Sequence, residues 1–264
     1  MYDVLVLTPN GDKYKLIMPH RCGSGFIENL IDDNCFDVEV LGVNVSIHEK
    51  VYDYSLQKEL DLSYTKSESF VDETVKCVSY GRNPYKRIIS SFIQNSKIYK
   101  VPLNTSKSQI VSTFRNFIKK TKSVWEEYGD WYNTLPNQLP LVRHWDHFQP
   151  TYNDVMNALD WDTRAECQYL KLEHINDNFP LKKYWRSNND ITWEEITSNY
   201  YSQRNSWKNS ELYHYSKYTF NMSTSQFYDN YIIKLVNEMF EKDFKVFDYD
   251  VFNDIKQIEE MDNE

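Results

Sequence analysis

Apolar residues along the chain follow two spacings, one typical of strands and one typical of helices. Short apolar runs predict strands over 4–8, 14–18, 38–47, 74–80 and 168–172. The first two runs are separated by Pro9-Asn10-Gly11-Asp12, whose Asn-Gly pair is typical of a hairpin turn. The run over 38–47 is rich in β-branched residues, which predicts a buried strand.

Apolar residues at helical spacing follow several of these strands. They predict helices over 26–31, 84–93, 107–128, 154–159 and 227–240. The last of them has one apolar face, made of Ile232, Leu235, Val236, Met239 and Phe240. Strands that alternate with helices imply a largely parallel sheet covered on both faces, so the predicted fold class is α/β. We expect a single domain over 1–264, with a frayed acidic tail over about 256–264.

Composition and charge narrow the classes of function. Of the 264 residues 41% are hydrophobic and 16% aromatic, which supports a sizeable core, and the net charge of -9 argues against general nucleic-acid binding. No apolar run approaches the roughly 20 residues that span a bilayer, and the first residues lack the features of a signal peptide. Cys22, Cys35, Cys77 and Cys167 show no paired spacing. Free thiols, a soluble protein and a cytoplasmic location are therefore expected.

The turn between the strand over 14–18 and the next helix has the composition of an anion-binding loop. Its sequence is PHRCGSGF, residues 19–26. The two glycines let backbone N–H groups approach an anion, the helix N-terminus adds its dipole, and the basic side chains add charge. A purely structural turn is the alternative. The predicted anion contacts are His20, Arg21, Cys22, Gly23, Ser24, Gly25 and Phe26.

A second turn carries a candidate phosphate clamp within GRNPYKRIISSF, residues 81–92. Asn83 can cap the helix and Pro84 suits its first position. Arg82 then lies at the mouth of the helix, where its planar guanidinium can hold a phosphate with two hydrogen bonds. Ser90 follows eight residues later. The alternative makes Arg82 a surface ion-pair partner and Ser90 a filler.

The two turns together resemble the sulfotransferase superfamily, especially its carbohydrate (Golgi-type) branch. PHRCGSGF stands where that family has its 5′-phosphosulfate loop, and GRNPYKRIISSF is similar to its 3′-phosphate motif, including the Arg and Ser eight residues apart. Three later segments are similar to family patterns in the right order, namely DHFQPTY (146–152), QYLKLEHINDNF (168–179) and LVNEMFEKDFKVFDYD (235–250).

The resemblance implies a P-loop-like, doubly wound sheet and transfer of a sulfuryl group from 3′-phosphoadenosine-5′-phosphosulfate (PAPS), with no metal. Arg82 and Ser90 would bind the 3′-phosphate of the donor. The family loop carries a Lys where this chain has His20, so either His20 or Arg21 would supply the cation at the leaving group.

The general base and the acceptor are also implied by the resemblance. His48 follows the strand over 38–47, where related enzymes often carry a His, and Glu49 is the adjacent alternative. The expected partners are a small donor nucleotide and an acceptor hydroxyl, with a glycan as the leading expectation.

Two other functions stay open at this point. A P-loop-type kinase or nucleotide hydrolase lacks support because no Lys follows Gly25. A non-catalytic nucleotide- or glycan-binding protein is compatible with His20 in place of the Lys. His144 and His147 could flank a metal, but no third ligand is evident, so no metal is expected. Glu173 ends a strand and could orient a ligand or a cation, or form a buried ion pair.

Overall fold

The computed structural model describes residues 2–19, 21–45, 50–53, 58–61, 74–94, 106–128, 151, 167–186, 191–205, 210–211, 219–220 and 222–263. Its strands are β1 (Tyr2–Leu7), β2 (Lys13–Met18), β3 (Glu39–Val45), β4 (Lys50–Asp53), β5 (Lys58–Asp61), β6 (Val75–Gly81), β7 (Gln168–Lys171), β8 (Ser210–Glu211) and β9 (Thr219–Phe220). Its α-helices are α1 (Ser24–Asp32), α2 (Pro84–Gln94), α3 (Lys107–Tyr128), α6 (Ile175–Asn178), α7 (Trp193–Asn205), α8 (Asn230–Met239), α9 (Glu241–Val246) and α10 (Ile255–Asn263). Short 3-10 helices cover Leu172–His174, Lys182–Tyr184 and Ser225–Phe227.

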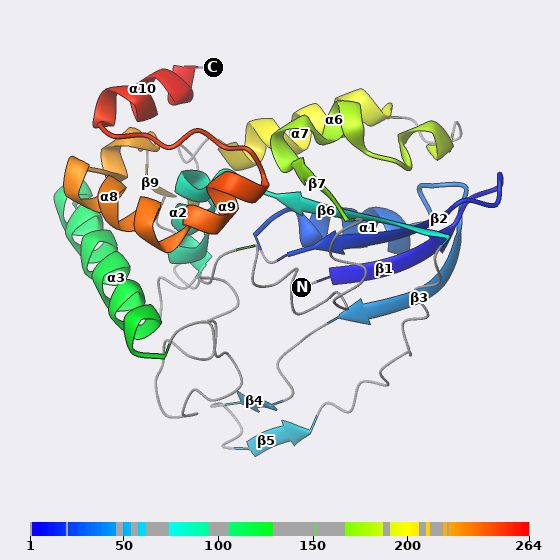
Figure 1. The fold of residues 1–264 in the computed structure, drawn as a ribbon, viewed down its shortest axis with the longest axis horizontal. Coiled ribbons are helices and arrows are strands. Elements are labelled where there is room, and N and C mark those ends of the chain that lie inside the picture. Colours follow the sequence, from blue (N-terminus) through cyan, green and yellow to red (C-terminus); the bar gives the residue numbers. More distant parts are fainter. Residues whose placement is uncertain are drawn as a thin grey trace.

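The central sheet has five strands in the order β3-β1-β2-β6-β7 (Figure 1). β1 is antiparallel to both of its neighbours, whereas β2, β6 and β7 are mutually parallel. The sheet of this α/β domain is therefore mixed, and the largely parallel, P-loop-like, doubly wound sheet is not confirmed. The cause is the short connection over 8–12, which is long enough for a hairpin but not for a crossover. β3 still runs in the direction of β2, because both are antiparallel to β1.

The predicted hairpin between the first two strands is confirmed. Leu7 pairs with Lys13, and the N–H groups of Thr8 and Gly11 donate to the carbonyl oxygens of Asp12 and Thr8, each at 2.9 Å. Gly11 has a φ of 83°, a left-handed conformation that glycine adopts without a steric cost. This turn makes β1 the antiparallel strand of the sheet.

The strand predicted within 38–47 is confirmed as β3, but its burial is not. β3 is the last strand on one side of the five-stranded sheet, and Val40 and Leu41 are 42% and 43% exposed. An apolar, β-branched run suits a pleated backbone wherever it lies in a sheet, so it does not distinguish an edge from the centre.

Each face of the sheet packs against a different part of the chain. One face buries Leu16, Met18 and Val78 against residues of α1, of α6 and of α7, including Trp193. The other face carries a smaller cluster of Ile17, Cys77, Cys167 and Phe247. All four cysteines are free thiols, as expected.

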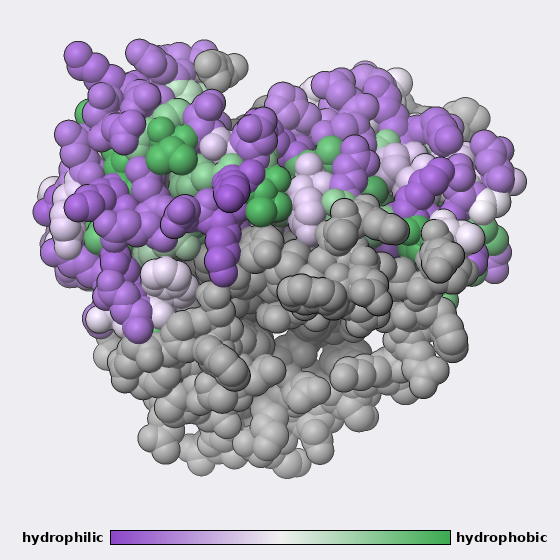
Figure 2. Space-filling view, viewed as in Figure 1, coloured by the Kyte–Doolittle hydropathy of each residue, from purple (hydrophilic) through white to green (hydrophobic). Residues whose placement is uncertain are grey.

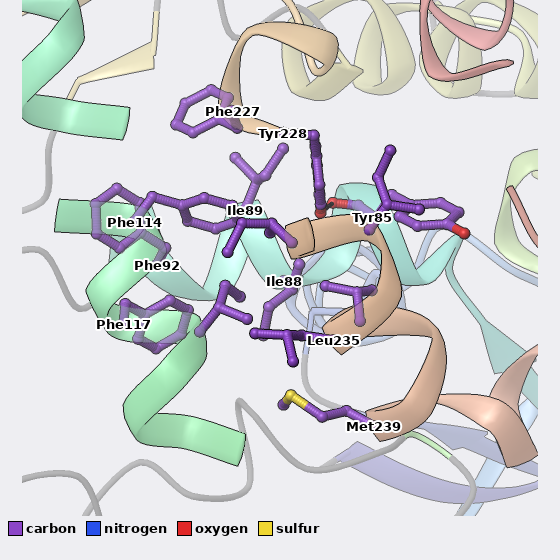
Figure 3. Close-up of a cluster of buried hydrophobic side chains, with 14 of the residues drawn as sticks. Tyr85, Ile88, Ile89, Phe92, Phe114, Phe117, Phe227, Tyr228, Leu235 and Met239 are labelled. Carbon is purple, nitrogen blue, oxygen red and sulfur yellow. Dashed lines mark hydrogen bonds between the residues drawn. The ribbon is translucent and has the colours of Figure 1, made fainter. Parts of the chain in front are cut away.

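The largest apolar cluster lies among helices beside the sheet (Figure 3). Phe92 of α2 faces Phe114 and Phe117 of α3, with ring centroids 5.3 and 5.5 Å apart. The predicted apolar face of α8 is buried in this cluster together with residues of α9. The cluster anchors α2, the helix that follows the second turn.

Most of the predicted elements are confirmed, with small shifts at their ends. The predicted helix over 107–128 is confirmed as α3, with the same bounds. α8 begins at Asn230 rather than at 227, because Asp229 caps it by accepting from the N–H of Ile232 at 2.9 Å. The predicted helix over 154–159 lies outside the described residues.

On the face shown in Figure 2, hydrophilic residues form most of the surface that the described residues contribute. No helix within the described ranges combines the length and the apolar character needed to cross a membrane.

The expectation of a frayed acidic tail is wrong. Residues 255–263 form α10, in which Ile258 is fully buried against the helical cluster. Asp262 accepts from the N–H of Ser225 at 2.9 Å, and Met261 packs beside the same cluster. Apolar residues three apart give this helix a buried side despite its acidic outer side.

The buried position of Ile258 gives a direct test of this correction. Replacing Ile258 by alanine should lower the free energy of unfolding by about 2–5 kcal/mol, because it leaves a cavity in the cluster. Urea denaturation measures the change. The matched control is Glu259→Ala on the exposed side of α10, with an expected change within about 0.5 kcal/mol. Equal stability of the two variants would mean that α10 is not docked in solution.

Candidate functional site

The carboxyl ends of β2, β6 and β7 lie at one end of the sheet, because these strands are parallel. The turns after β2 and β6 are the two candidate anion-binding turns of the sequence, and the turn after β7 contacts the second of them. Residues 19–23 follow β2 and lead into α1, residues 82–83 follow β6 and lead into α2, and residues 172–174 follow β7. Ligands of open α/β sheets bind at this end, so the candidate site is built from these three turns.

The first turn is a tight loop with two left-handed residues. Arg21 and Gly23 have φ angles of 67° and 85°. The N–H of Cys22 donates to the carbonyl oxygen of Pro19 at 3.0 Å, and the N–H of Phe26 donates to that of Gly23 at 3.0 Å. The left-handed φ at Gly23 favours glycine, and a Cβ there would lie 2.9 Å from a methyl group of Leu172, whose side chain would have to shift.

These hydrogen bonds narrow the set of backbone donors for an anion. The N–H groups of Cys22 and Phe26 are used inside the loop. Among the described residues, none accepts a hydrogen bond from the N–H of Ser24 or Gly25. Both belong to the first turn of α1, where the unpaired N–H groups and the helix dipole favour an anion.

Cys22 is a packing residue of the first turn and does not supply a thiolate. Its thiol is fully buried, and its Sγ lies 3.7 Å from the Oγ1 of Thr151. Burial raises the pKa of Cys22 to about 11, although the positive charges of Arg87 and Arg82 act in the opposite direction. The thiol therefore stays protonated at neutral pH, which excludes it as a nucleophile.

The second turn has the helix start that the sequence predicts. The Oδ1 of Asn83 accepts from the N–H of Tyr85 at 3.0 Å and from that of Lys86 at 3.4 Å. Pro84 is the first residue of α2. The capping role of Asn83 is thus confirmed, and Arg82 lies one residue before the cap.

Arg82 is buried, which excludes the alternative of a surface ion-pair partner. Arg82 is 5% exposed. Its Nη1 lies 3.5 Å from the carbonyl oxygen of Arg21, at the outer limit of a hydrogen bond. The first and second turns therefore meet at Arg82. Ser90 is half-buried on α2.

Glu173 and Tyr249 surround the second turn. The Oε1 of Glu173 accepts from the N–H of Asn83 at 3.0 Å. The single hydrogen of the Tyr249 hydroxyl is shared between the Oε2 of Glu173 at 2.5 Å and the carbonyl oxygen of Gly81 at 2.9 Å. Glu173 thus accepts from a backbone N–H beside Arg82 and from a phenol. A Cβ at Gly81 would overlap the ring of Phe247.

The roles of Phe247 and Tyr249 are not evident from either turn alone. The available signal is the closing segment over 235–250, whose Phe247 and Tyr249 belong to the pattern that resembles the family. Asp243 belongs to the same pattern, and its Oδ2 accepts from the N–H of Thr151 at 2.8 Å. Through Thr151 this segment also reaches Cys22 in the first turn.

Several predicted site residues are not placed. His20, His48, Glu49, His144 and His147 lie outside the described residues. Within the described ranges, no three His, Cys, Asp or Glu side chains are grouped so that they could hold a metal ion. The described part of the site therefore consists of Arg21 to Phe26, Arg82 and Ser90, with Glu173 and Tyr249 against the peptide groups beside Arg82.

Comparison with known families completes the description of the site. Residues 39–250 match the model of the sulfotransferase family, which covers most of the chain. The matched range includes the second turn, Glu173 and Tyr249, whereas the first turn and α10 lie outside it. No curated protein and no solved structure matches the chain.

Proposed function

Because the chain belongs to the sulfotransferase family, we propose that it transfers a sulfuryl group from PAPS to an acceptor hydroxyl, with a carbohydrate as the acceptor. One observation carries the proposal. The buried guanidinium of Arg82 lies at the start of α2 and beside the backbone of Arg21, so the two anion-binding turns adjoin. A donor with phosphate groups at its 3′ and 5′ ends matches two adjoining turns of this kind.

Each turn has its own part in binding the donor. Arg82 and Ser90 hold the 3′-phosphate, and the buried position of Arg82 strengthens a charge-assisted contact by excluding water. The N–H groups of Ser24 and Gly25 hold the 5′-phosphosulfate at the N-terminus of α1. His20 or Arg21 adds the positive charge at the bridging oxygen.

The proposed reaction is an in-line displacement at sulfur. The acceptor oxygen forms a bond to sulfur while the bond from sulfur to the bridging oxygen breaks, which leaves 3′-phosphoadenosine-5′-phosphate. His48, or Glu49 as the alternative, takes the proton of the acceptor hydroxyl. The basic group in the first turn and the N–H groups of Ser24 and Gly25 stabilise the charge that grows on the leaving oxygen. The residues in this scheme call for no metal.

Nucleotide selectivity tests the assignment. The protein should bind 3′-phosphoadenosine-5′-phosphate about 10- to 100-fold more tightly than AMP, since a charge-assisted contact contributes roughly 1.5–3 kcal/mol. Arg82→Ala should erase most of this preference, because it should weaken the binding of 3′-phosphoadenosine-5′-phosphate and not that of AMP. Isothermal titration calorimetry of both ligands measures the ratio of the affinities.

The matched control for this experiment is Arg115→Ala on α3, which removes a guanidinium outside both turns and should leave the ratio unchanged. Equal affinity of the unaltered protein for the two ligands would refute the assignment. Turnover of ATP that depends on Mg²⁺ would instead support a kinase or nucleotide hydrolase. Binding with the expected ratio but without sulfuryl transfer to any hydroxyl would support the non-catalytic alternative.

A further inference from the structure

We propose that Glu173 and Tyr249 are positioning residues that hold Arg82 in the orientation needed to select a 3′-phosphate. The inference rests on the proposed function, because it assigns to these two side chains a part in nucleotide selectivity. Neither side chain needs to touch the nucleotide. Their part is to fix the peptide groups on the two sides of Arg82.

The contacts enclose Arg82 from both directions along the chain. The carbonyl oxygen of Gly81, which precedes Arg82, accepts from the Tyr249 hydroxyl at 2.9 Å. The N–H of Asn83, which follows Arg82, donates to the Oε1 of Glu173 at 3.0 Å. The Tyr249 hydroxyl closes a ring of hydrogen bonds, because its one hydrogen is shared with the Oε2 of Glu173 at 2.5 Å. One carboxylate and one phenol therefore hold both neighbouring peptide groups.

The three parts of this ring come from distant places in the sequence. Gly81 ends β6, Glu173 follows β7, and Tyr249 follows α9. Tyr249 is 168 residues from Gly81 and 76 from Glu173. Local turn chemistry already caps α2 through the side chain of Asn83, so the helix start does not depend on the ring. The ring adds a tertiary restraint at the one residue between its two backbone contacts.

The charge and packing of the ring suit a rigid support. Hydrogen bonds to a carboxylate are about twice as strong as neutral ones, and a carboxylate at a helix N-terminus is stabilised by the dipole. The ring of Phe247 lies against Gly81 so closely that no Cβ fits there. A bidentate contact depends on the orientation of the guanidinium. In enzymes, a group misplaced by about 1 Å can lower the reaction rate about 100-fold. Loss of the hydrogen-bond ring should therefore weaken the binding of the 3′-phosphate by Arg82.

The test measures the ratio of affinities for 3′-phosphoadenosine-5′-phosphate and AMP. Tyr249→Phe keeps the aromatic ring and removes only the hydroxyl, and it should lower the ratio roughly tenfold. Glu173→Ala should lower it at least as much. Glu173→Gln keeps an acceptor for the N–H of Asn83 and a polar partner for Tyr249, so it should restore most of the ratio. A merely structural loss would weaken both ligands alike and leave the ratio unchanged.

A double variant shows whether the effect passes through Arg82. In an Arg82→Ala background, Tyr249→Phe should have no further effect on the ratio, because the side chain that the ring positions is absent. The matched control is Tyr231→Phe on α8, whose side chain is exposed. If Glu173→Ala does not fold, Tyr249→Phe and the double variant still decide the question.

Two outcomes overturn the inference and are distinct from each other. If the unaltered protein prefers the 3′-phosphorylated ligand and Arg82→Ala removes the preference, but Tyr249→Phe keeps the full ratio, the ring has no positioning role and the proposed function stands. If the unaltered protein shows no preference, the proposed function fails and the inference fails with it.

Discussion

Replacing His48 by alanine is expected to lower the turnover of sulfuryl transfer by about 10²–10⁴-fold, which is the usual contribution of a general base. The affinity for the donor nucleotide should stay nearly unchanged, because a general base acts on the acceptor hydroxyl and not on the nucleotide. The topology supports this assignment. β3 runs in the direction of β2 and ends at Val45, so the chain leaves it at the end of the sheet where the two turns lie. His48 follows three residues later in the sequence.

Steady-state transfer from PAPS to an acceptor sugar measures the turnover, and calorimetry measures the donor affinity. Lys234→Ala on α8 is the control, because it removes an exposed basic side chain outside the three turns and should keep full turnover. Unchanged turnover in His48→Ala would contradict the assignment. A loss of about the same size in Glu49→Ala alone would transfer the role of base to Glu49.

The parts of the site that depend on nearest neighbours in sequence could be predicted. Asn83 and Pro84 specify the start of α2 by their own side chains, and the structure confirms that start. The Asn10-Gly11 pair likewise specifies the hairpin. In both places a short-range hydrogen bond or a backbone preference decides the conformation, so a single sequence contains the information.

The parts that depend on distant neighbours could not be predicted. The sequence showed Glu173 at the end of a strand and Tyr249 near the end of the chain, but not that both contact the turn at Arg82. It also left Arg82 open between a surface and a buried position. Pairing between strands decides such questions, and it is set by the topology as a whole. The pairing of β1 with β3 and the edge position of β3 escaped prediction for the same reason.

α10 escaped prediction for a different reason. Its apolar residues Ile255, Ile258 and Met261 recur every three positions, which is a helical pattern visible in the sequence. The acidic residues between them led to the expectation of a frayed end. Charge on the outer side of a helix does not oppose burial of its inner side, and the fully buried Ile258 shows which feature decides.

The last prediction concerns His20, the main departure of the first turn from the family pattern. A lysine side chain loses its charge near pH 10.4 and an imidazole near about 6.5, and a bound anion moves both values upward. If His20 is the cation at the leaving oxygen, the charged form is the active one, so activity should fall on the alkaline side as the imidazole loses its proton. His20→Lys should move this alkaline limb upward by about one unit or more. His20→Ala should be nearly inactive at every pH.

The same pH–rate series separates His20 from Arg21. A guanidinium keeps its charge throughout the accessible range, so if Arg21 serves the leaving group the unaltered protein should show no alkaline limb from this source. Arg21→Ala should then be the inactive variant, and His20→Ala should keep its rate. The left-handed φ of 67° at Arg21 requires a control for strain, and Arg21→Lys keeps a cation on the same backbone. Donor affinity measured for each variant distinguishes a lost charge from a lost site, because the N–H groups of Ser24 and Gly25 remain. Full activity in both alanine variants would refute a role for either side chain at the leaving oxygen.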